Sequence, residues 1–465
     1  MAKPQTNPPH VRHILAASMI ATVVVTLDVS VVNIAVPQFE RTFGVRADAA
    51  QWALNAYTLV FASLLLNAGA LVDRWGTRRT FIAGFAVFTA ASLACGGAPN
   101  WSALLAARAC QGVGAALLIP SALALIQRGI PDPTDRARAI GWWAASGSAA
   151  LAAGPVVAGA LVTLAGWRSI FLINIPIGMT GIWFAWRHLP TQRSEGGKRP
   201  DVAGQLLAMA MLACLVLAIS YSGRRGPTNA VVLGLTTAAI VLASLLTAVE
   251  RRVRAPMLPP GLLARGPFVA AVATGAVISF VFYGLIFVLS VYFQLGQHRD
   301  ALGAGLALAP MMVVLVGVNA FAGWLDAHVG ARMTIVIGLA LVAAGCIAMA
   351  VVADTPALVP LLPSLLLIGT GTAMAVPAIA TSALVGVPLE VGGIASGVLN
   401  AARQVGGALG VAVFGSMLGA NVSIAATLRL TGVVAAAMTL FTVAVAVAIY
   451  HGADHRRHPT GNERC

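Results

Sequence analysis

The sequence predicts an all-α membrane protein with fourteen transmembrane helices, and three features lead to this fold class. First, 59% of the 465 residues are hydrophobic and only 9% are charged, whereas soluble domains carry about 25% charged residues. Second, the apolar residues form runs of about 20, the length an α-helix needs to cross hydrocarbon about 30 Å thick. Third, the arginines gather in the short segments between these runs, as in other membrane proteins. Such long runs are helical, because only helices and closed barrels can span a bilayer.

The runs divide the chain into fourteen expected helices, with the least distinct boundary in 382–400. They cover residues 13–36, 51–71, 80–97, 103–126, 139–165, 170–187, 203–221, 230–249, 267–293, 302–323, 332–352, 357–381, 392–418 and 428–450. The first run contains Asp28 and lacks a small-residue cleavage site after it, so we interpret it as a helix and not as a removed signal peptide. The five cysteines show no spacing typical of disulfides or metal sites and are expected to be small packing residues.

The distribution of positive charge predicts the orientation. With the N-terminus inside the cell, the cytoplasmic segments hold 20 lysines and arginines and the outer segments hold 7. Cytoplasmic loops of membrane proteins carry such an excess. We therefore expect a multi-pass protein of the inner (plasma) membrane with both termini in the cytoplasm. The net charge of +14 then reflects orientation, and we expect no nucleic-acid partner.

A short pattern recurs at an offset of 254 residues. Its four positions are Gly69, Leu71, Gly76 and Arg78 after the second run, and Gly323, Leu325, Gly330 and Arg332 after the tenth. Transporters are commonly built from such repeats, with the binding site between them. The offset predicts an N-terminal six-helix bundle in residues 1–190 and a C-terminal six-helix bundle with a cytoplasmic tail in 263–465. An inserted helix pair with its flanking loops occupies 191–262.

Several motifs resemble those of one transporter family. The first helix carries Leu27-Asp28-Val29-Ser30-Val31-Val32-Asn33-Ile34-Ala35-Val36-Pro37, and the loop after the second reads Gly69-Ala70-Leu71-Val72-Asp73-Arg74-Trp75-Gly76-Thr77-Arg78-Arg79. Later helices carry Arg108 before Gln111-Gly112-Val113-Gly114, and Gly154-Pro155 before Gly159. Two more runs are Trp167-Arg168 before Phe171-Leu172-Ile173-Asn174-Ile175-Pro176, and Asn400-Ala401-Ala402-Arg403-Gln404-Val405-Gly406-Gly407. Together they are similar to the major facilitator superfamily, and within it to the fourteen-helix drug:proton antiporters.

The resemblance implies a role for each motif. Arg108 corresponds to a proton-linked arginine, and Gly154, Pro155 and Gly159 to the helix associated with antiport. The loop residues Gly69, Asp73, Arg74, Gly76 and Arg78 would form a gate that latches one conformation at the cytoplasmic mouth; the alternative is a solvated turn that serves orientation. For the glycines and Pro155, ordinary close packing between membrane helices explains the pattern equally well.

Asp28 and Arg108 carry charge deep within expected helices. A charge at that depth costs at least about 2.5–3.5 kcal/mol on insertion scales, so it rarely persists without a role. Both residues lie roughly 10–14 Å below the outer ends of their helices, at about 1.5 Å per residue, and can share one layer of the bundle. Burial favours a neutral carboxyl group, whereas a nearby guanidinium favours the ionised form. We therefore predict that Asp28 carries a proton and Arg108 modulates it; the alternative is a static ion pair.

Arg403, near mid-membrane, could hold carbonyl groups of a substrate or pair across the bundles, and the same two roles are open to Asn33 and Gln404. The alternative for Arg403 is a structural pair with backbone carbonyls. Since Asp28 is the only acid deep within a run, we expect neutral, weakly charged or amphipathic substrates. The chain has two lysines and no phosphate-binding loop motif, so ATP is not expected to drive it directly.

The function predicted from these features is proton-coupled export of drugs or antibiotics by alternating access. The partners we expect are a small-molecule substrate, protons and membrane lipids, acting on a monomer without cofactors. Catalytic and metal-binding residues are not expected, and the chain is not predicted to be an enzyme. Two alternatives are a transporter of the same fold with a metabolic substrate, and a membrane sensor or scaffold without transport.

Overall fold

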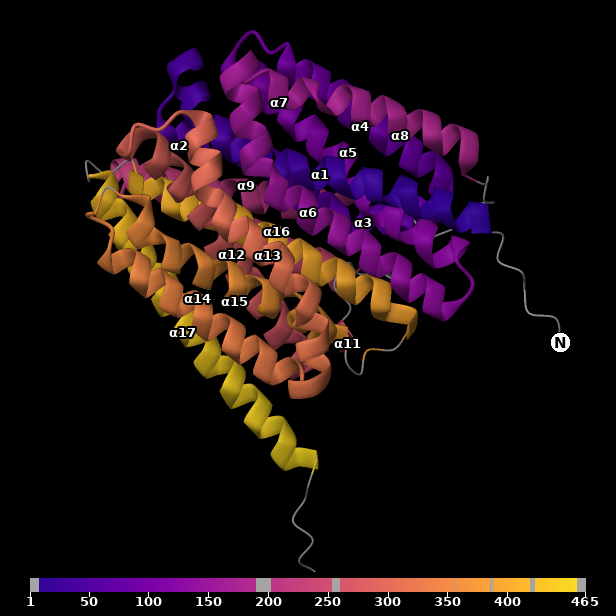
Figure 1. Ribbon diagram of the computed structural model, residues 1–465. Coiled ribbons are helices and arrows are strands. Elements are labelled where there is room, and N and C mark those ends of the chain that lie inside the picture. The colour runs from indigo at the N-terminus through magenta and orange to yellow at the C-terminus, as the bar shows by residue number, and fades with distance from the viewer. Residues whose placement is uncertain are drawn as a thin grey trace, which may run out of the picture.

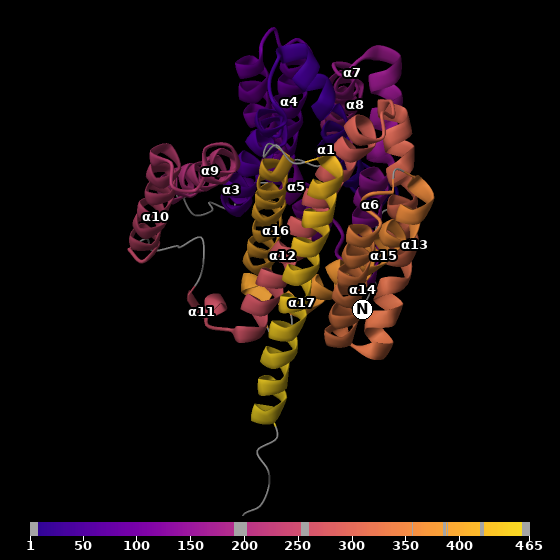
Figure 2. The ribbon, with the colours of Figure 1, turned by 90° about the vertical axis from the view of Figure 1, so that its left-hand side faces the viewer.

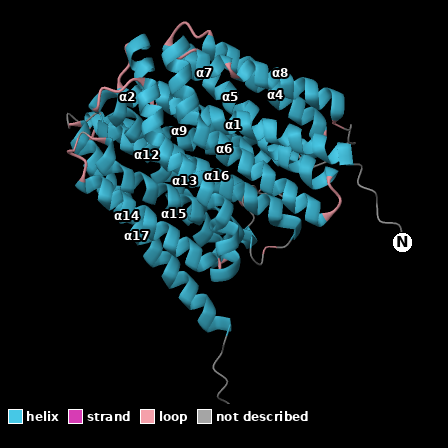
Figure 3. Ribbon diagram, viewed as in Figure 1, coloured by secondary structure: helices cyan, strands magenta, loops and turns pink. Residues whose placement is uncertain are grey.

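The structure is a computed structural model that describes residues 8–189, 202–252, 260–355, 357–384, 387, 389–418 and 423–457. Helices and short connections account for the whole of this described chain, as Figure 3 shows. The N-terminal half contains α1 (Pro8–Phe43), α2 (Ala47–Ala50), α3 (Trp52–Trp75), α4 (Thr77–Gly96), α5 (Trp101–Gly129), α6 (Pro133–Ala165), α7 (Ser169–Leu172) and α8 (Asn174–His188). Next come α9 (Val202–Arg225) and α10 (Ala230–Glu250). The C-terminal half contains α11 (Pro260–Leu263), α12 (Gly266–Val291), the π-helical turn η1 (Tyr292–Gly296), α13 (Ala301–Val329), α14 (Ala331–Val351), α15 (Leu358–Leu384), α16 (Leu389–Leu418) and α17 (Ile424–Arg457).

Fourteen of these helices correspond to the fourteen predicted spans. Within the described residues, 13 helices are long and apolar enough to cross a membrane, and Trp52–Leu65 of α3 forms a shorter apolar stretch. The whole of α3 has 24 residues, which reach about 36 Å at 1.5 Å per residue. The predicted fold class, two six-helix bundles with two inserted helices, is confirmed.

The first helix is longer than predicted. It was expected to end at residue 36, but α1 continues through Pro37 to Phe43. Hydropathy marks only the part of a helix that lies in hydrocarbon, so polar turns such as that around Glu40 and Arg41 escape it. Pro37 does not end α1, because a helix inside a bundle gains most of its stability from packing; Val36 and Phe39 beside it are fully buried.

The backbone supports the predicted duplication. Gly76, between α3 and α4, has φ 86° and ψ 143°, and Gly330, between α13 and α14, has φ 86° and ψ 147°. Each carbonyl accepts a hydrogen bond at 3.1 Å from the hydroxyl group four residues later, of Thr80 and of Thr334. Only glycine adopts this positive φ at little cost. The two junctions, 254 residues apart, therefore have the same local structure.

An even number of crossings places both described chain ends on one side of the bundle, which we call the terminal face. Figure 1 shows the start of α1 at the right of the view and the end of α17 at the bottom. The other side, the opposite face, carries the connections after α1, α4 and α12.

The inserted pair, α9 and α10, lies outside both six-helix bundles. Figure 2 shows it at the left edge of the molecule, beside α3 and away from α13 and α14. Helix α9 packs on α3 and α16, and its Ser220 hydroxyl accepts a hydrogen bond of 3.0 Å from Gln51. Helix α10 presents large apolar side chains outward, for example Ile240, which is 62% exposed. The pair thus adds a lipid-facing edge where the two bundles meet.

The two bundles contact each other closely on the side of the opposite face. The hydroxyl of Ser290 on α12 donates to the carbonyl of Asn33 on α1 at 2.9 Å. Gln294, one turn further along, donates to the carbonyl of Ile34 at 3.0 Å. A single apolar cluster includes buried side chains from both bundles in this region, among them Phe39 and Phe293. The described contacts therefore close the structure toward the opposite face.

Candidate functional site

A buried ion pair lies inside the N-terminal bundle. Asp28 on α1 and Arg108 on α5 are both fully buried, and the Nη1 atom of Arg108 lies 2.6 Å from Oδ2 of Asp28. The Nε atom of the same guanidinium donates to the carbonyl of Ala53 on α3 at 2.7 Å. The two residues predicted to share a layer are thus in direct contact, with a backbone acceptor as third partner.

Three neutral polar side chains complete this network. Gln111 donates to Oδ1 of Asp28 at 2.7 Å and accepts from Nη1 of Arg108 at 2.6 Å. Its amide also donates to the hydroxyl of Ser92 on α4 at 2.8 Å. Asn174, the first residue of α8, donates to the same carboxylate oxygen at 3.0 Å. The carboxylate is therefore held by side chains from two helices, by Arg108 and Gln111 of α5 and by Asn174 of α8.

Glycines bring these helices close enough for the network to form. A Cβ atom at Gly112 would lie 2.6 Å from the carbonyl oxygen of Tyr57 on α3, and one at Gly114 would lie 2.6 Å from the backbone nitrogen of Phe88 on α4. Small residues allow such close approach in membrane bundles. The tight packing places Arg108 beneath the ring of Tyr57, with 4.5 Å between the guanidinium carbon and the ring centroid.

Several polar atoms of this cluster are buried without a hydrogen-bond partner. They are Nη2 of Arg108, the hydroxyl oxygen of Tyr57 and Oδ1 of Asn174. A buried polar atom without a partner costs about 1–3 kcal/mol, and such atoms are rare in folded proteins. The network around Asp28 therefore contains donor and acceptor atoms without partners, which can form new hydrogen bonds when a side chain changes its protonation or its rotamer.

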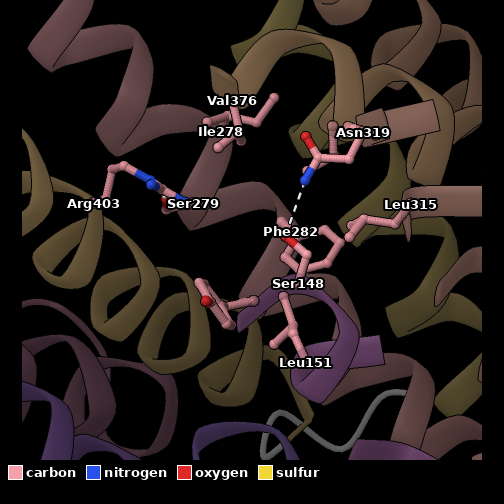
Figure 4. Close-up of a pocket in the computed structure, with 12 residues that line it drawn as sticks. Ser148, Leu151, Ile278, Ser279, Phe282, Leu315, Asn319, Val376 and Arg403 are labelled. Carbon is pink, nitrogen blue, oxygen red and sulfur yellow. Dashed lines mark hydrogen bonds between the residues drawn. The ribbon is translucent and has the colours of Figure 1, made fainter. Parts of the chain in front are cut away.

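A cavity lies at mid-depth between the two bundles. The space between its walls, part of it open solvent, is about 470 Å³, of which about 80 Å³ can hold the centre of a water molecule. One wall comes from Ser148 and Leu151 on α6, and the others come from α12, α13, α15 and α16. Figure 4 shows the amide of Asn319 crossing to the hydroxyl of Ser148, a hydrogen bond of 2.9 Å between the bundles.

Arg403, predicted as a substrate or interbundle contact, lines this cavity. Its Nε atom donates to the hydroxyl of Ser279 on α12 at 3.4 Å. Gln404 is partly buried on α16 and is not among the residues that line the cavity. Asn33 lies at the bundle interface through its backbone carbonyl, while its side-chain amide donates to Val29 in its own helix at 3.1 Å.

Helix α6, which carries the predicted antiport motif, packs against two neighbours. A Cβ atom at Gly154 would overlap Ser30 on α1, in the same bundle. The carbonyl of Pro155 lies against Gly305 of α13, and a Cβ atom at Gly159 would lie 2.6 Å from the carbonyl oxygen of Ala301. Pro155 and Gly159 therefore belong to the contact between bundles, whereas Gly154 belongs to packing within one of them.

The predicted cytoplasmic gate is only partly described. Gly69 and Asp73 belong to α3, but the side chain of Asp73 and the burial of Gly69 lie outside the described residues. Arg74 is exposed, and Arg78 donates to the carbonyl of Trp186 at the end of α8 at 2.6 Å. Gly76 forms the turn between α3 and α4. That this loop latches one conformation stays a prediction.

Sequence reasoning did not place Gln111, Ser92 and Asn174 in the site. Gln111 and Asn174 stand within the quoted motifs, three residues after Arg108 and seven after Trp167. The spacing of Gln111 from Arg108 is a usable signal, because residues three apart lie on the same helix face. Ser92 carries no comparable signal, since isolated serines are common in membrane helices.

Removing the Gln111 amide should destabilise the bundle. In Gln111→Met, Asp28 and Arg108 each lose a hydrogen bond, and bonds to charged groups contribute about 1.5–3 kcal/mol each. We expect the free energy of unfolding to fall by about 3 kcal/mol, visible as a lower melting temperature of the purified protein. Gln404→Met makes the same chemical change where no side-chain hydrogen bond is described, and should change stability by less than about 0.5 kcal/mol. Equal melting temperatures for the two variants would contradict the network.

Taken together, the two six-helix bundles, the mid-depth cavity between them and the buried ion pair within the N-terminal bundle define a secondary transporter. Comparisons with known proteins place it in a family. The model of the Major Facilitator Superfamily matches residues 18–411. The chain belongs to this superfamily.

Two relatives and two solved structures illustrate the similarity. The chain is 37% identical over 396 residues to the methylenomycin A resistance protein of Bacillus subtilis, covering 84% of each chain. It is 33% identical over 409 residues to the multidrug resistance protein Stp of Mycobacterium tuberculosis, covering 88% of this chain and 76% of that protein. A POT family transporter matches with a TM-score of 0.70 at 14% identity, covering 94% of this chain and 96% of that one. A bacterial homologue of the human lysosomal transporter Spinster, inward-facing and occupied, matches with a TM-score of 0.67 at 18% identity, covering 95% and 97%. At these identities the two structures show the shared fold alone.

Proposed function

We propose that this transporter exports antimicrobial small molecules from the cell in exchange for protons. The names of its relatives support the substrate class: they include the methylenomycin A and multidrug resistance proteins and the cephamycin export protein of Amycolatopsis lactamdurans, to which the chain is 33% identical over 419 residues. The exchange involves a small molecule, protons and the surrounding lipid, and one copy of the chain carries it out.

The observation that carries the proton-coupling proposal is the buried carboxylate of Asp28 beside Arg108. A carboxylate without access to bulk water keeps its charge only while its partners stay in place. When the bundles rock, α1 and α5 change their surroundings, and a displaced guanidinium leaves the carboxyl group favoured in its neutral form. Asp28 thus takes up a proton from one side and releases it on the other, and this cycle drives the alternation.

The excess of positive charge assigns the terminal face to the cytoplasm in this proposal. The contacts of Ser290 with Asn33 and of Gln294 with Ile34 then lie toward the outside of the cell. With this orientation, the conformation described above is closed to the outside, and substrate enters the central cavity from the cytoplasm. Opening these contacts would release it outward.

The proposal predicts drug resistance that depends on the proton gradient. An efflux-deficient bacterial host that expresses the chain should tolerate about tenfold or more of at least one antibiotic in a broad panel, because one proton moving through 100 mV supplies about 2.3 kcal/mol. Intracellular accumulation of that compound should return to the control level when an uncoupler is added. A host whose sensitivity is unchanged across the panel, or efflux that survives the uncoupler, would refute the proposed function.

A further inference from the structure

The central cavity contains a positive charge for which the described residues supply no counter-ion. Arg403 lines it, and within the described parts of the chain no carboxylate lies at ion-pair distance from its guanidinium. Asp28, the acid nearest to mid-membrane, is fully buried and already paired with Arg108. An arginine keeps its charge in proteins, and an unpaired charge in an apolar surrounding is strongly unfavourable. The cavity therefore favours a negatively charged occupant.

The neighbouring polar groups are also able to donate hydrogen bonds to such an occupant. The hydroxyl of Thr372 is buried, 5% exposed as a residue, and has no hydrogen-bond partner. Ser279 accepts from Arg403 through its oxygen, so its own hydrogen stays free. Both residues line the cavity. A guanidinium and two hydroxyl donors form a set suited to a carboxylate or sulfonate group.

Much of the remaining cavity wall is apolar, and its other polar residues are Ser148, Tyr283 and Asn319. Figure 4 shows Ile278 and Val376 above the guanidinium and Leu151, Phe282 and Leu315 on the side away from it. The positive charge thus lies at one end of the cavity and most of the apolar surface at the other. A ligand that satisfies both ends has a charged head and an apolar body.

We propose that the central cavity binds an amphipathic organic anion, whose acidic group pairs with Arg403 and contacts Ser279 and Thr372 while its apolar body packs against Phe282 and Leu315. This inference rests on the proposed function and names the substrate class of the exporter. It narrows the substrate class expected from the sequence, which included neutral, weakly charged and amphipathic compounds.

A matched pair of fluorescent probes tests the inference on the purified full-length protein in phosphatidylcholine nanodiscs. N-dansyl-leucine is an aromatic carboxylate, and its methyl ester has nearly the same shape without the charge. We expect the wild-type protein to bind the acid about tenfold more tightly than the ester, as for one charge-assisted hydrogen-bonded pair. The Arg403→Gln variant should bind the acid and the ester equally. Its affinity for the ester should equal that of the wild-type protein, which would show that the variant is folded. Arg403→Lys should keep part of the preference.

Two controls separate the site from other effects. Arg251→Gln removes a positive charge from the exposed end of α10, outside the cavity, and should keep the full preference for the acid. Adding phosphatidylglycerol should leave the affinity for the acid unchanged. A tenfold loss would instead identify a lipid phosphate as the occupant and overturn the proposal.

The other possible results of the binding experiment also test the anion assignment. Equal binding of acid and ester by the wild-type protein, no binding of the acid, or an undiminished preference in Arg403→Gln would overturn the anion assignment. Because the probes are titrated without a proton gradient, this result is independent of export. Uncoupler-sensitive efflux without charge preference would refute only the substrate class, whereas Arg403-dependent binding without efflux would refute only the transport proposal.

Discussion

Replacing Asp28 by asparagine should abolish uphill transport while substrate still equilibrates across the membrane. The amide cannot carry a proton, so the gradient no longer acts on the cycle. One charge moving through 100 mV supplies about 2.3 kcal/mol, a concentration ratio of about 50. In proteoliposomes with an imposed gradient, accumulation by Asp28→Asn should fall from about this ratio to no accumulation. Exchange of labelled against unlabelled substrate should persist, because the cavity between the bundles is unchanged.

The structure indicates that this variant keeps its fold. The oxygen of an asparagine at position 28 can still accept from Arg108, and Asn174, whose Oδ1 has no partner, can turn that oxygen toward the new amide. A matched control is Asp354→Asn, which makes the same change in an exposed ion pair with Arg429. Surface pairs contribute at most about 1 kcal/mol, so this control should transport normally. Accumulation against a gradient by Asp28→Asn would show that another group carries the proton.

The positions of the membrane helices could be predicted because each apolar run carries its own signal. A single charge at mid-membrane costs several kcal/mol, so the fourteen runs stand out without any knowledge of packing. The same cost drew attention to Asp28, Arg108 and Arg403. The end of α1 was misplaced because the helix continues into a polar region where this signal vanishes.

The neutral part of the site could not be predicted in the same way. Asn174 reaches Asp28 across 146 residues of sequence and Gln111 across 83, and such contacts depend on how helices cross. The cavity is a further example, since its walls come from one helix of the first bundle and four of the second. Among the residues that line the cavity, only Arg403 could be singled out from the sequence, because serine, threonine and apolar residues are common in membrane helices.

Gly305→Ala should shift the transporter away from the closed conformation described above. A Cβ atom at this position of α13 would overlap the carbonyl oxygen of Pro155 on α6. A backbone carbonyl group cannot relieve the overlap by changing its rotamer, as a side chain can. Overpacking of this kind costs about 1–3 kcal/mol. The cost arises only while the two helices are in contact, so it favours conformations in which they have separated, by a factor of roughly 5 to 150.

Cysteine labelling measures this shift. Ser290 is fully buried in the closed contact between α12 and α1. A Ser290→Cys substitution, in a background with the five native cysteines replaced, reports its opening to a membrane-impermeant maleimide. Labelling from outside should rise about tenfold in Gly305→Ala, and transport should slow because the return to the closed state becomes less favourable.

The control lies on the same helix. A Cβ atom at Gly317 meets no atom within 4 Å, so Gly317→Ala adds the same methyl group without a clash. It should leave labelling unchanged and raise stability slightly, since alanine favours a helix over glycine by up to about 1 kcal/mol. Gly305→Ala gains the same helical preference, so any difference between the two variants comes from the contact with Pro155. If both label alike, the approach of α6 to α13 does not hold the closed state, and the contacts of α12 with α1 must suffice.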